Sequence, residues 1–324
     1  MTRRFVNGLA PTERQPDRQS PFQRRVLHAA LFLLWCFMAP GVMRAAESSN
    51  ASPRHVTVPF EVRRGHVMVP TLMNGTNKLS LLLDTGYGMT MLHPDHIASA
   101  SLTRSGRGIT VVGIAGEERT SVFEGPGFDF RGWTWTPRRI AALTSDDRFG
   151  SRRRDGILGS GFFRRFVVEL HPARKELVLH EPDTFTPSAD GEVLALSFKS
   201  STPTVEATVK LSQGREVRAV FEIDTGCDGA LCLGNHFVKE HGLAAAVGNE
   251  GGRIGVGGST RIRESRLGQL RLGRLVVEKP EVNLFLEGSP VDAPIAGHIG
   301  WDLLKQFHIV FDYSRRQMIL KRLE

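Results

Sequence analysis

From about Val56 onward, the chain alternates short apolar runs with polar turns that contain glycine. The apolar runs at 67–69 and 79–83 flank Asn74-Gly75. An Asn-Gly pair between two apolar runs predicts a β-hairpin, because both residues tolerate the backbone conformation of a tight turn. The first part of this region is therefore expected to form β-strands.

The same pattern returns in the second half of the chain. Residues 205–211 alternate apolar and polar side chains, and a turn at Gln213-Gly214 leads back through 217–223. Helical patterns are brief, and we expect short helices at 93–100, 162–166, 235–241 and 303–307. The fold class predicted is mostly β.

Both hairpins lead into the tripeptide Asp-Thr-Gly, at residues 84–86 and 224–226, which lie 140 residues apart. Later landmarks repeat at nearly the same separation. They are a glycine-rich stretch at 113–116 and 255–258, and Ile157-Leu158-Gly159 followed by His298-Ile299-Gly300. One Asp-Thr-Gly arises easily by chance, but several ordered features at one separation do not. The sequence therefore predicts a tandem duplication.

The duplication suggests a division of the chain into segments. We expect a first lobe at 47–181, a linker at 182–192 that is rich in Pro, Asp and Thr, and a second lobe at 193–324. Residues 1–46 form a separate leader. A body of about 270 residues is long enough to bury a large core.

The leader has the pattern of an export signal. Arg24-Arg25 precede an uncharged, mostly apolar run of 14 residues, 26–39, which Pro40-Gly41 and the small pair Ala45-Ala46 follow. This run is shorter than the roughly 20 residues of a membrane span. We expect a signal peptide and an extracytoplasmic protein, periplasmic or secreted. Retention of 26–43 as a membrane anchor is the alternative.

The net charge of +8 gives little support to nucleic-acid binding. Residues 1–46 hold seven Arg against Glu13 and Asp17, so the leader accounts for +5 and the remaining chain for +3. The basic cluster 152–154 is interpreted as a solvated loop. No nucleic-acid partner is expected, and contact with a membrane is expected only if the leader is retained.

Cysteine is sparse. Outside the leader only Cys227 and Cys232 remain, and an even pair in an exported chain can form a disulfide. Such a short loop would contribute about 2 kcal/mol to stability. Two thiols without a histidine at ligand spacing predict no metal site. The glycines at 255–258 lack the Gly-Lys-Ser/Thr ending of a phosphate loop, so no cofactor is expected.

The order of these landmarks resembles an aspartic peptidase lobe. Asp-Thr-Gly, then a glycine-rich hairpin, then two residues and a Gly that opens a short helix occur in this order in each half. The unit length and the run 300–304 are more similar to retroviral-type peptidases than to half of a pepsin. The resemblance covers about 56–320 and implies a bacterial secreted, single-chain, retropepsin-like or pepsin-like protein with two similar closed-barrel-like lobes.

The resemblance also implies roles for individual residues. Asp84 and Asp224 would be the catalytic pair that activates water for peptide hydrolysis, since two adjacent carboxylates share a proton and can act as acid and base. The catalytic loops would be supported by Thr85, Gly86, Thr225 and Gly226. Two flaps would bind substrate through Gly113, Ile114, Ala115, Gly116, Gly255, Val256, Gly257 and Gly258.

The expected partner is a peptide or protein substrate in extended conformation, bound by a monomer whose two lobes share one site. A dimer with sites made of Asp84/Asp84 and Asp224/Asp224 is the competing arrangement. The short linker favours pairing within one chain, because tethering gives roughly millimolar effective concentration.

Two residues depart from the pepsin pattern. Where pepsin-like enzymes carry Ser or Ala after Asp-Thr-Gly, this chain has Tyr87 and Cys227. Without a hydroxyl donor to the outer carboxylate oxygen, we expect a less acidic pH optimum, near neutral. A bulky Tyr87 in the site also keeps an alternative open, namely a catalytically inactive pseudopeptidase that binds peptides without cutting them.

Overall fold

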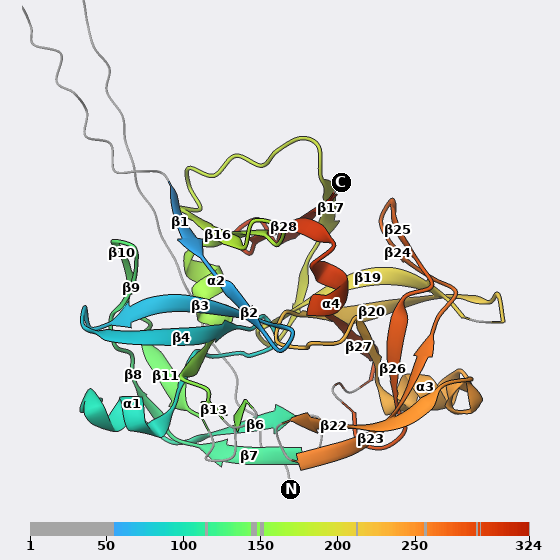
Figure 1. Ribbon diagram of the computed structural model, residues 1–324, viewed down its shortest axis with the longest axis horizontal. Helices are drawn as coiled ribbons and strands as arrows, with labels where there is room; N and C mark the ends of the chain where they lie inside the picture. Colours follow the sequence, from blue (N-terminus) through green and yellow to red (C-terminus); the bar gives the residue numbers. More distant parts are fainter. Residues whose placement is uncertain are drawn as a thin grey trace, which may run out of the picture. The chain divides into compact units, whose positions relative to one another are not determined.

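The structure, a computed structural model, describes residues 55–113, 116–143, 148–149, 152–211, 213–255, 258–289, 291 and 293–323. The chain divides at residue 50, and all described residues belong to the unit 51–324. Strands dominate this unit (Figure 1) and form two large sheets, a six-stranded sheet and two small two-stranded ladders. None of the described helices is long and apolar enough to cross a membrane.

The first large sheet contains the first predicted hairpin. β3 (His66–Met73) pairs antiparallel with β4 (Asn77–Leu83) around Asn74 and Gly75, whose positive φ angles form the tight turn. β4 leads into Asp84, and β14 (Gly156–Leu158) runs parallel beside it. The other strands of this sheet are β2 (Glu61–Arg63), β5 (Met91–Leu92), β8 (Val122–Glu124), β9 (Phe128–Phe130), β10 (Trp133–Trp135) and β11 (Arg139–Ala142).

The second large sheet repeats this arrangement. β19 (Thr202–Lys210) pairs antiparallel with β20 (Glu216–Asp224), which ends at the second aspartate, and β27 (Ile295–Gly300) runs parallel beside β20. The other strands are β18 (Ser197–Lys199), β21 (Leu231–Leu233), β22 (Asn249–Gly255), β23 (Gly258–Arg266), β24 (Gln269–Leu272), β25 (Leu275–Glu278) and β26 (Glu281–Phe285). Each lobe thus delivers one aspartate from an equivalent strand.

A six-stranded sheet joins the two halves. Its strand order is β1-β16-β15-β28-β29-β17. At its centre, β15 from the first half pairs antiparallel with β28 from the second. The bounds are β1 (His55–Pro59), β15 (Val167–His171), β16 (Glu176–His180), β17 (Glu192–Ala195), β28 (Phe307–Asp312) and β29 (Gln317–Arg322).

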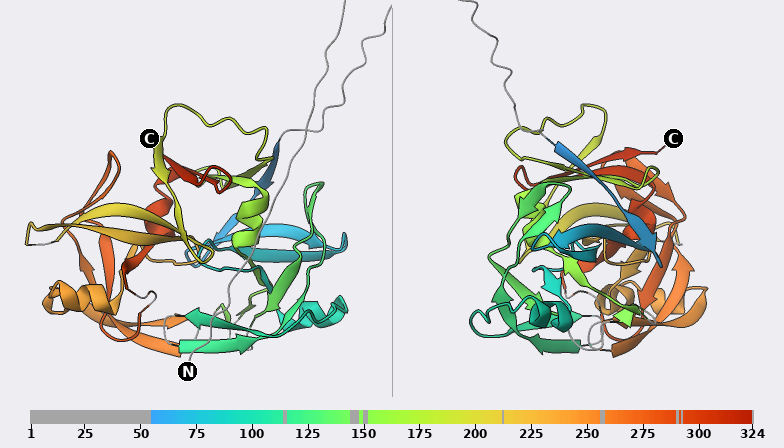
Figure 2. Two further views of the ribbon diagram at one scale, coloured as in Figure 1. Left: turned by 180° about the vertical axis from the view of Figure 1, so that it is seen from behind. Right: turned by 60° about the vertical axis from the view of Figure 1, so that its left-hand side comes forward.

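Two hairpins lie on the side of the molecule opposite this sheet (Figures 1 and 2). One is formed by β6 (Ile109–Gly113) and β7 (Gly116–Thr120), the other by β22 and β23. A further short ladder pairs β12 (Arg148–Phe149) with β13 (Arg152–Arg153). The helices are α1 (Pro94–Ser99), α2 (Ser160–Arg165), α3 (Asn235–Glu240) and α4 (Trp301–Leu304), with a 3-10 turn η1 (Leu243–Ala245).

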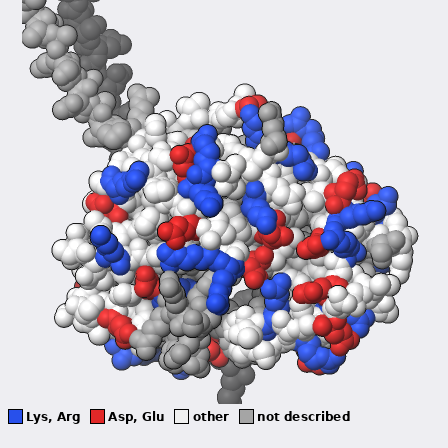
Figure 3. All heavy atoms as spheres, in the orientation of Figure 1, with Lys and Arg blue, Asp and Glu red and all other residues white. Residues whose placement is uncertain are grey.

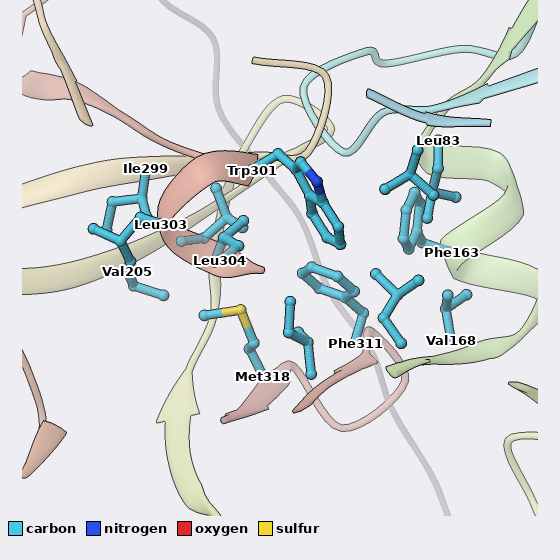
Figure 4. Packing of buried hydrophobic residues seen from close by; sticks show 14 of the residues in the cluster. Leu83, Phe163, Val168, Val205, Ile299, Trp301, Leu303, Leu304, Phe311 and Met318 are labelled. Atoms are coloured by element: carbon cyan, nitrogen blue, oxygen red, sulfur yellow. The ribbon is translucent and has the colours of Figure 1, made fainter. Parts of the chain in front are cut away.

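One hydrophobic core runs through both lobes. Figure 4 shows Leu83 and Phe163 from the first half packed near Trp301 and Phe311 from the second. The rings of Phe163 and Phe311 meet edge to face at 5.4 Å between centroids, a geometry that favours aromatic pairs. Packing from both halves therefore supports the region where the two Asp-Thr-Gly loops, 84–86 and 224–226, meet.

The mostly β class is confirmed, but the expectation of closed-barrel-like lobes is wrong. In the described residues each large sheet is open, since its end strands, β10 and β8 in the first and β22 and β25 in the second, do not pair with each other. Strand periodicity reports local conformation and burial, whereas closure depends on pairing between distant strands. The four short helices form where expected, although α4 begins directly after Gly300 rather than at 303.

Charged side chains of both signs lie interspersed on the face shown in Figure 3. Ion pairs in the second lobe include Arg261 with Glu250 at 3.2 Å and with Glu287 at 2.9 Å. Exposed pairs of this kind contribute only about 0–1 kcal/mol each. Their effect on fold stability is therefore small.

Candidate active site

The two Asp-Thr-Gly loops meet at the centre of the unit. Asp84 is 4% exposed, and its carboxylate is hydrogen-bonded to that of Asp224. Each carboxylate also accepts a backbone N–H from its own loop, with Gly86 N at 2.8 Å from Asp84 Oδ1 and Gly226 N at 2.9 Å from Asp224 Oδ1. The loops thus hold a buried and a mostly buried carboxyl group next to each other within a single chain.

Thr85 and Thr225 brace the two loops reciprocally. The hydroxyl of Thr85 donates to Ile223 O at 2.6 Å and accepts the N–H of Thr225 at 3.0 Å. In the same way, Thr225 Oγ1 donates to Leu83 O at 2.8 Å and accepts the N–H of Thr85 at 3.1 Å. Because all four bonds are buried and cross between the lobes, they fix the separation of the carboxylates.

Glycine is required after each threonine because the opposite carboxylate comes so close. A Cβ at Gly226 would lie 2.0 Å from Asp84 Oδ2, and one at Gly86 would lie 2.8 Å from Asp224 Oδ1. These separations are shorter than van der Waals contact. Any side chain at Gly226 would therefore displace the carboxylate of Asp84.

His298 is a site residue that we did not predict. It is 9% exposed on β27, and its Nδ1 lies 3.0 Å from Asp224 Oδ2, the oxygen not used by the Gly226 amide. Its Nε2 lies 3.0 Å from Glu222 Oε2. Both ring nitrogens can donate only in the imidazolium form, so this histidine can place a positive charge beside Asp224.

These contacts polarise the carboxylate pair. Burial and the negative charge of Asp224 raise the pKa of Asp84 well above its ordinary value, although the Arg154 guanidinium opposes them. For Asp224, burial acts to raise the pKa, but the hydrogen bond and charge of His298 outweigh it and lower the pKa. The directions of these shifts favour ionisation of Asp224 and protonation of Asp84.

The same network sets the protonation of His298. Burial disfavours the charged imidazole, but hydrogen bonds with Asp224, Cys227 and Glu222 raise its pKa well above the ordinary value. The expectation that the outer oxygen lacks a donor is therefore wrong for Asp224, since His298 occupies that place. Arg154, which we expected in a solvated loop, is partly buried and acts on Asp84 through its charge.

The glycine-rich stretches lie at the tips of the two hairpins described above. Gly113 and Gly116 pair at the end of β6/β7, and Gly255 and Gly258 pair at the end of β22/β23. The tip residues Ile114, Ala115, Val256 and Gly257 lie outside the described residues. The second hairpin is tied to the segment that follows the second Asp-Thr-Gly, because Arg253 Nη1 donates to Asp228 Oδ1 at 3.1 Å.

Tyr87 and Cys227 follow their Asp-Thr-Gly tripeptides with different surroundings. Tyr87 packs against an apolar cluster that includes Met68, Leu82 and Met91, to which strand β6 also contributes. Cys227 and Cys232 are free thiols with their sulfur atoms 3.4 Å apart, longer than the about 2.05 Å of a disulfide. The cysteine pair is therefore placed for a disulfide without having formed one.

Three side chains at the site have the chemistry of metal ligands. Asp224, Cys227 and His298 each offer one ligand atom within 4.8 Å of the others. Their hydrogen bonds with Asp84, Cys232 and Glu222 account for all three side chains without an ion. His93 and His96 are engaged separately, by the Asp95 amide at 3.2 Å and by Asp155 at 3.1 Å.

One pattern in the sequence could have revealed His298. In the duplication it replaces Ile157, an apolar residue on a fully buried strand. A polar side chain at a buried position needs a hydrogen-bond partner, because burying it without one costs free energy. The partner could not be named from the sequence, because Asp224 is reached only through pairing of β20 with β27.

Comparisons with known proteins address the family of the first lobe and the overall fold. Residues 69–162 match the family described as aspartyl protease. The fold is similar to the crystal structure of aspartic proteinase from Irpex lacteus, with a TM-score of 0.59, 13% identity and coverage of 83% of this chain and 98% of that chain. No curated protein sequence matches this chain. The predicted resemblance to aspartic peptidases is confirmed by the family match in the first lobe and by the fold of both lobes.

Proposed function

We propose that this chain is an aspartic endopeptidase that hydrolyses peptide bonds with water activated between Asp84 and Asp224. The observation that carries the proposal is the pair of buried, hydrogen-bonded carboxylates with opposite pKa shifts. Retaining two like-charged groups in a buried site is costly unless they share a proton. Family match and fold support a peptidase in general.

The reaction follows from the polarisation of the pair. Asp224, ionised, accepts a proton from water as the water oxygen attacks the scissile carbonyl carbon. Asp84 gives its proton to the carbonyl oxygen, which forms a neutral tetrahedral diol. Collapse of the diol breaks the C–N bond while Asp224 returns the proton to the leaving nitrogen, and Asp84 recovers its own from the hydroxyl. Of the two aspartates, His298 contacts only Asp224, and it acts as a positioning residue.

An extended peptide is the substrate that this scaffold favours. The hairpins β6/β7 and β22/β23 offer strand backbone with which a substrate strand can pair. Closure of such hairpins over the peptide would exclude water and align the scissile bond. We therefore assign the segments 113–116 and 255–258 to substrate binding.

The test is cleavage of a mixed peptide library by the purified full chain. Asp84→Asn keeps the shape of the side chain but removes the acid, and we expect activity to fall about 100- to 10,000-fold. Asp183→Asn changes an exposed aspartate in the linker and serves as the control. Equal loss in both variants, or unchanged cleavage in Asp84→Asn, would exclude the proposed dyad.

The same experiment distinguishes the inactive alternative. A pseudopeptidase would bind library peptides, as fluorescence anisotropy of labelled peptides would show, without producing fragments from the unmodified chain. Sedimentation at the assay concentration tests the proposed monomer. Activity that appears only with dimer would contradict a site built from one chain.

We also propose that residues 1–46 direct export and are removed. Arg24-Arg25, the apolar run 26–39 and the small pair Ala45-Ala46 support this proposal. Amino-terminal sequencing of the protein recovered from an expression host tests it. An intact leader in a membrane fraction would favour the alternative, a retained anchor over 26–43.

A further inference from the structure

A second cluster of ionisable side chains lies on the six-stranded sheet. Glu169 on β15 contacts three imidazoles through their Nε2 atoms. His171 and His308 lie 3.1 and 2.7 Å from Oε1, and His180 lies 2.6 Å from Oε2. These residues come from β15, β16 and β28 and belong to neither catalytic loop.

The pairing of the strands places the cluster on one face of this sheet. Glu169 lies opposite Val310 in the ladder between β15 and β28, so the next positions on the same face bring His171 toward His308. The face also carries the small apolar cluster of Val167, Val310 and Ile319. The four polar side chains are therefore held by regular strands rather than by loops.

The donor atoms converge as metal ligands do. The rings of His171 and His308 stack at 4.0 Å between centroids and 13° between planes, and both direct Nε2 to the same carboxylate oxygen. One ligand atom from each of Glu169, His171 and His308 lies within 4.8 Å of the others. A zinc ion about 2.0–2.2 Å from each such atom requires the two stacked rings to tilt apart, because a bound metal lies near the plane of each imidazole.

Access and charge are compatible with an ion. The four side chains are between 16% and 21% exposed, so the cluster is open to solvent at its edge. The nearby cations are engaged elsewhere, Arg174 with Glu176 at 2.7 Å and Lys321 with Asp190 at 2.6 Å.

We propose that Glu169, His171 and His308 bind a divalent cation of the zinc class. His180 would hold the second carboxylate oxygen, as a partner that orients the ligand, and water would complete a tetrahedral site. Imidazole and carboxylate donors suit Zn²⁺ and also Co²⁺ and Ni²⁺, with affinity set by the usual order of these metals. Because β15 and β28 come from different halves of the chain, the ion would cross-link them.

The test uses the metal-free full chain with Zn²⁺ and with Co²⁺ as a spectroscopic probe. Equilibrium dialysis followed by metal analysis should find one bound zinc per chain that is lost in His171→Gln/His308→Gln. The matched control His236→Gln/His241→Gln removes two histidines outside the cluster and should bind zinc as the unmodified chain does. Zinc should raise the melting temperature of the unmodified chain and of this control, but not that of the cluster variant.

Two further variants distinguish zinc bound at this cluster from zinc bound elsewhere on the chain. His298→Gln alters the Asp224, Cys227 and His298 group, and it should leave the bound zinc unchanged. Cobalt bound at Glu169 should give visible bands without the intense near-ultraviolet absorption of a cobalt–thiolate bond. Should His171→Gln/His308→Gln fail to fold, Glu169→Gln keeps the side-chain shape and should lower zinc affinity at least tenfold. Full zinc binding by either folded cluster variant, or none by the unmodified chain, would overturn the proposal.

Discussion

His298 Nδ1 lies 3.0 Å from Oδ2 of Asp224, on the side of the carboxylate that faces away from the Gly226 amide. This contact gives the two Asp-Thr-Gly loops different electrostatics, although their sequences are so similar. The equivalent position in the first half is Ile157, which cannot donate a hydrogen bond. His298 therefore contributes to the polarisation of the pair from a position whose counterpart in the first half is apolar.

The first prediction concerns the pH dependence of His298→Gln. Activity should rise with pH as Asp224 ionises and fall as Asp84 loses its proton. Because the pKa of Asp224 is lowered and that of Asp84 is raised, the two limbs of the pH profile should lie far apart. Removing the imidazolium raises the pKa of Asp224, so the acidic limb of kcat/KM should move to higher pH. A hydrogen bond to a charged group is worth about 1.5–3 kcal/mol, so kcat/KM on that limb should fall about 10- to 100-fold.

A matched control is His96→Gln, which removes an imidazole paired with Asp155 instead. Its pH profile should coincide with that of the unmodified chain. Gln and Asn both keep an uncharged N–H donor, so His298→Leu, which has none, should move the acidic limb at least as far. If His298→Gln leaves the acidic limb in place, His298 does not hold the ionised state of Asp224.

The second prediction concerns Gly226→Ala. The new Cβ would lie 2.0 Å from Asp84 Oδ2, so the carboxylate must move and the shared proton is lost. Misplacement of a reacting group by about 1 Å can cost about 100-fold in rate, and we expect kcat to fall by at least this factor. Circular dichroism should show that the strands are retained.

Gly161→Ala on α2 provides the comparison, since its Cβ would meet only Trp135 at 3.5 Å. An Ala in a helix is favoured over Gly by about 1 kcal/mol. This variant should keep full activity and gain slightly in stability. Equal activity in the two variants would show that the close approach at Gly226 is not needed.

The third prediction concerns the threonine brace. Thr85→Val removes a hydroxyl that donates to Ile223 O and accepts from Thr225 N, which leaves two buried polar groups unpaired. Each unpaired group costs about 1–3 kcal/mol, so the free energy of unfolding should fall by about 2–6 kcal/mol. Denaturant titration measures this loss. Thr85→Ser retains the hydroxyl and should lose far less, and a similar loss in both would assign the effect to packing.

Much of the fold could be predicted from the pattern of neighbouring residues. The Asn74-Gly75 turn and the alternation in β19 and β20 each depend on neighbouring residues, and these elements form as predicted. The repeat placed two Asp-Thr-Gly tripeptides at equivalent points, and the structure brings them together. The openness of the sheets was not predictable in this way, because it depends on which distant strands pair.

The parts of the site that depend on contacts between strands could not be predicted from the sequence. His298 reaches Asp224 because β27 runs parallel to β20, and Arg154 influences Asp84 from outside the repeated motifs. Likewise, Glu169 and His308 are 139 residues apart and meet only through the pairing of β15 with β28. Sequence spacing identifies groups that share one strand or turn, and it does not identify groups assembled by a sheet.

The last prediction concerns Cys227 and Cys232. Their sulfur atoms are 3.4 Å apart in the thiol form, so a small movement would reach the about 2.05 Å of a disulfide. We expect mild oxidation of the purified full chain to link the two residues and to increase the free energy of unfolding. The gain should be only about 2 kcal/mol, because a short closed loop removes little entropy from the unfolded chain. Peptide mapping by mass spectrometry before and after reduction detects the linked peptide, and denaturant titration detects the gain. Cys232→Ser should show neither. If the oxidised chain contains no link, or if the link lowers stability, the buried geometry around Cys227 opposes the bond.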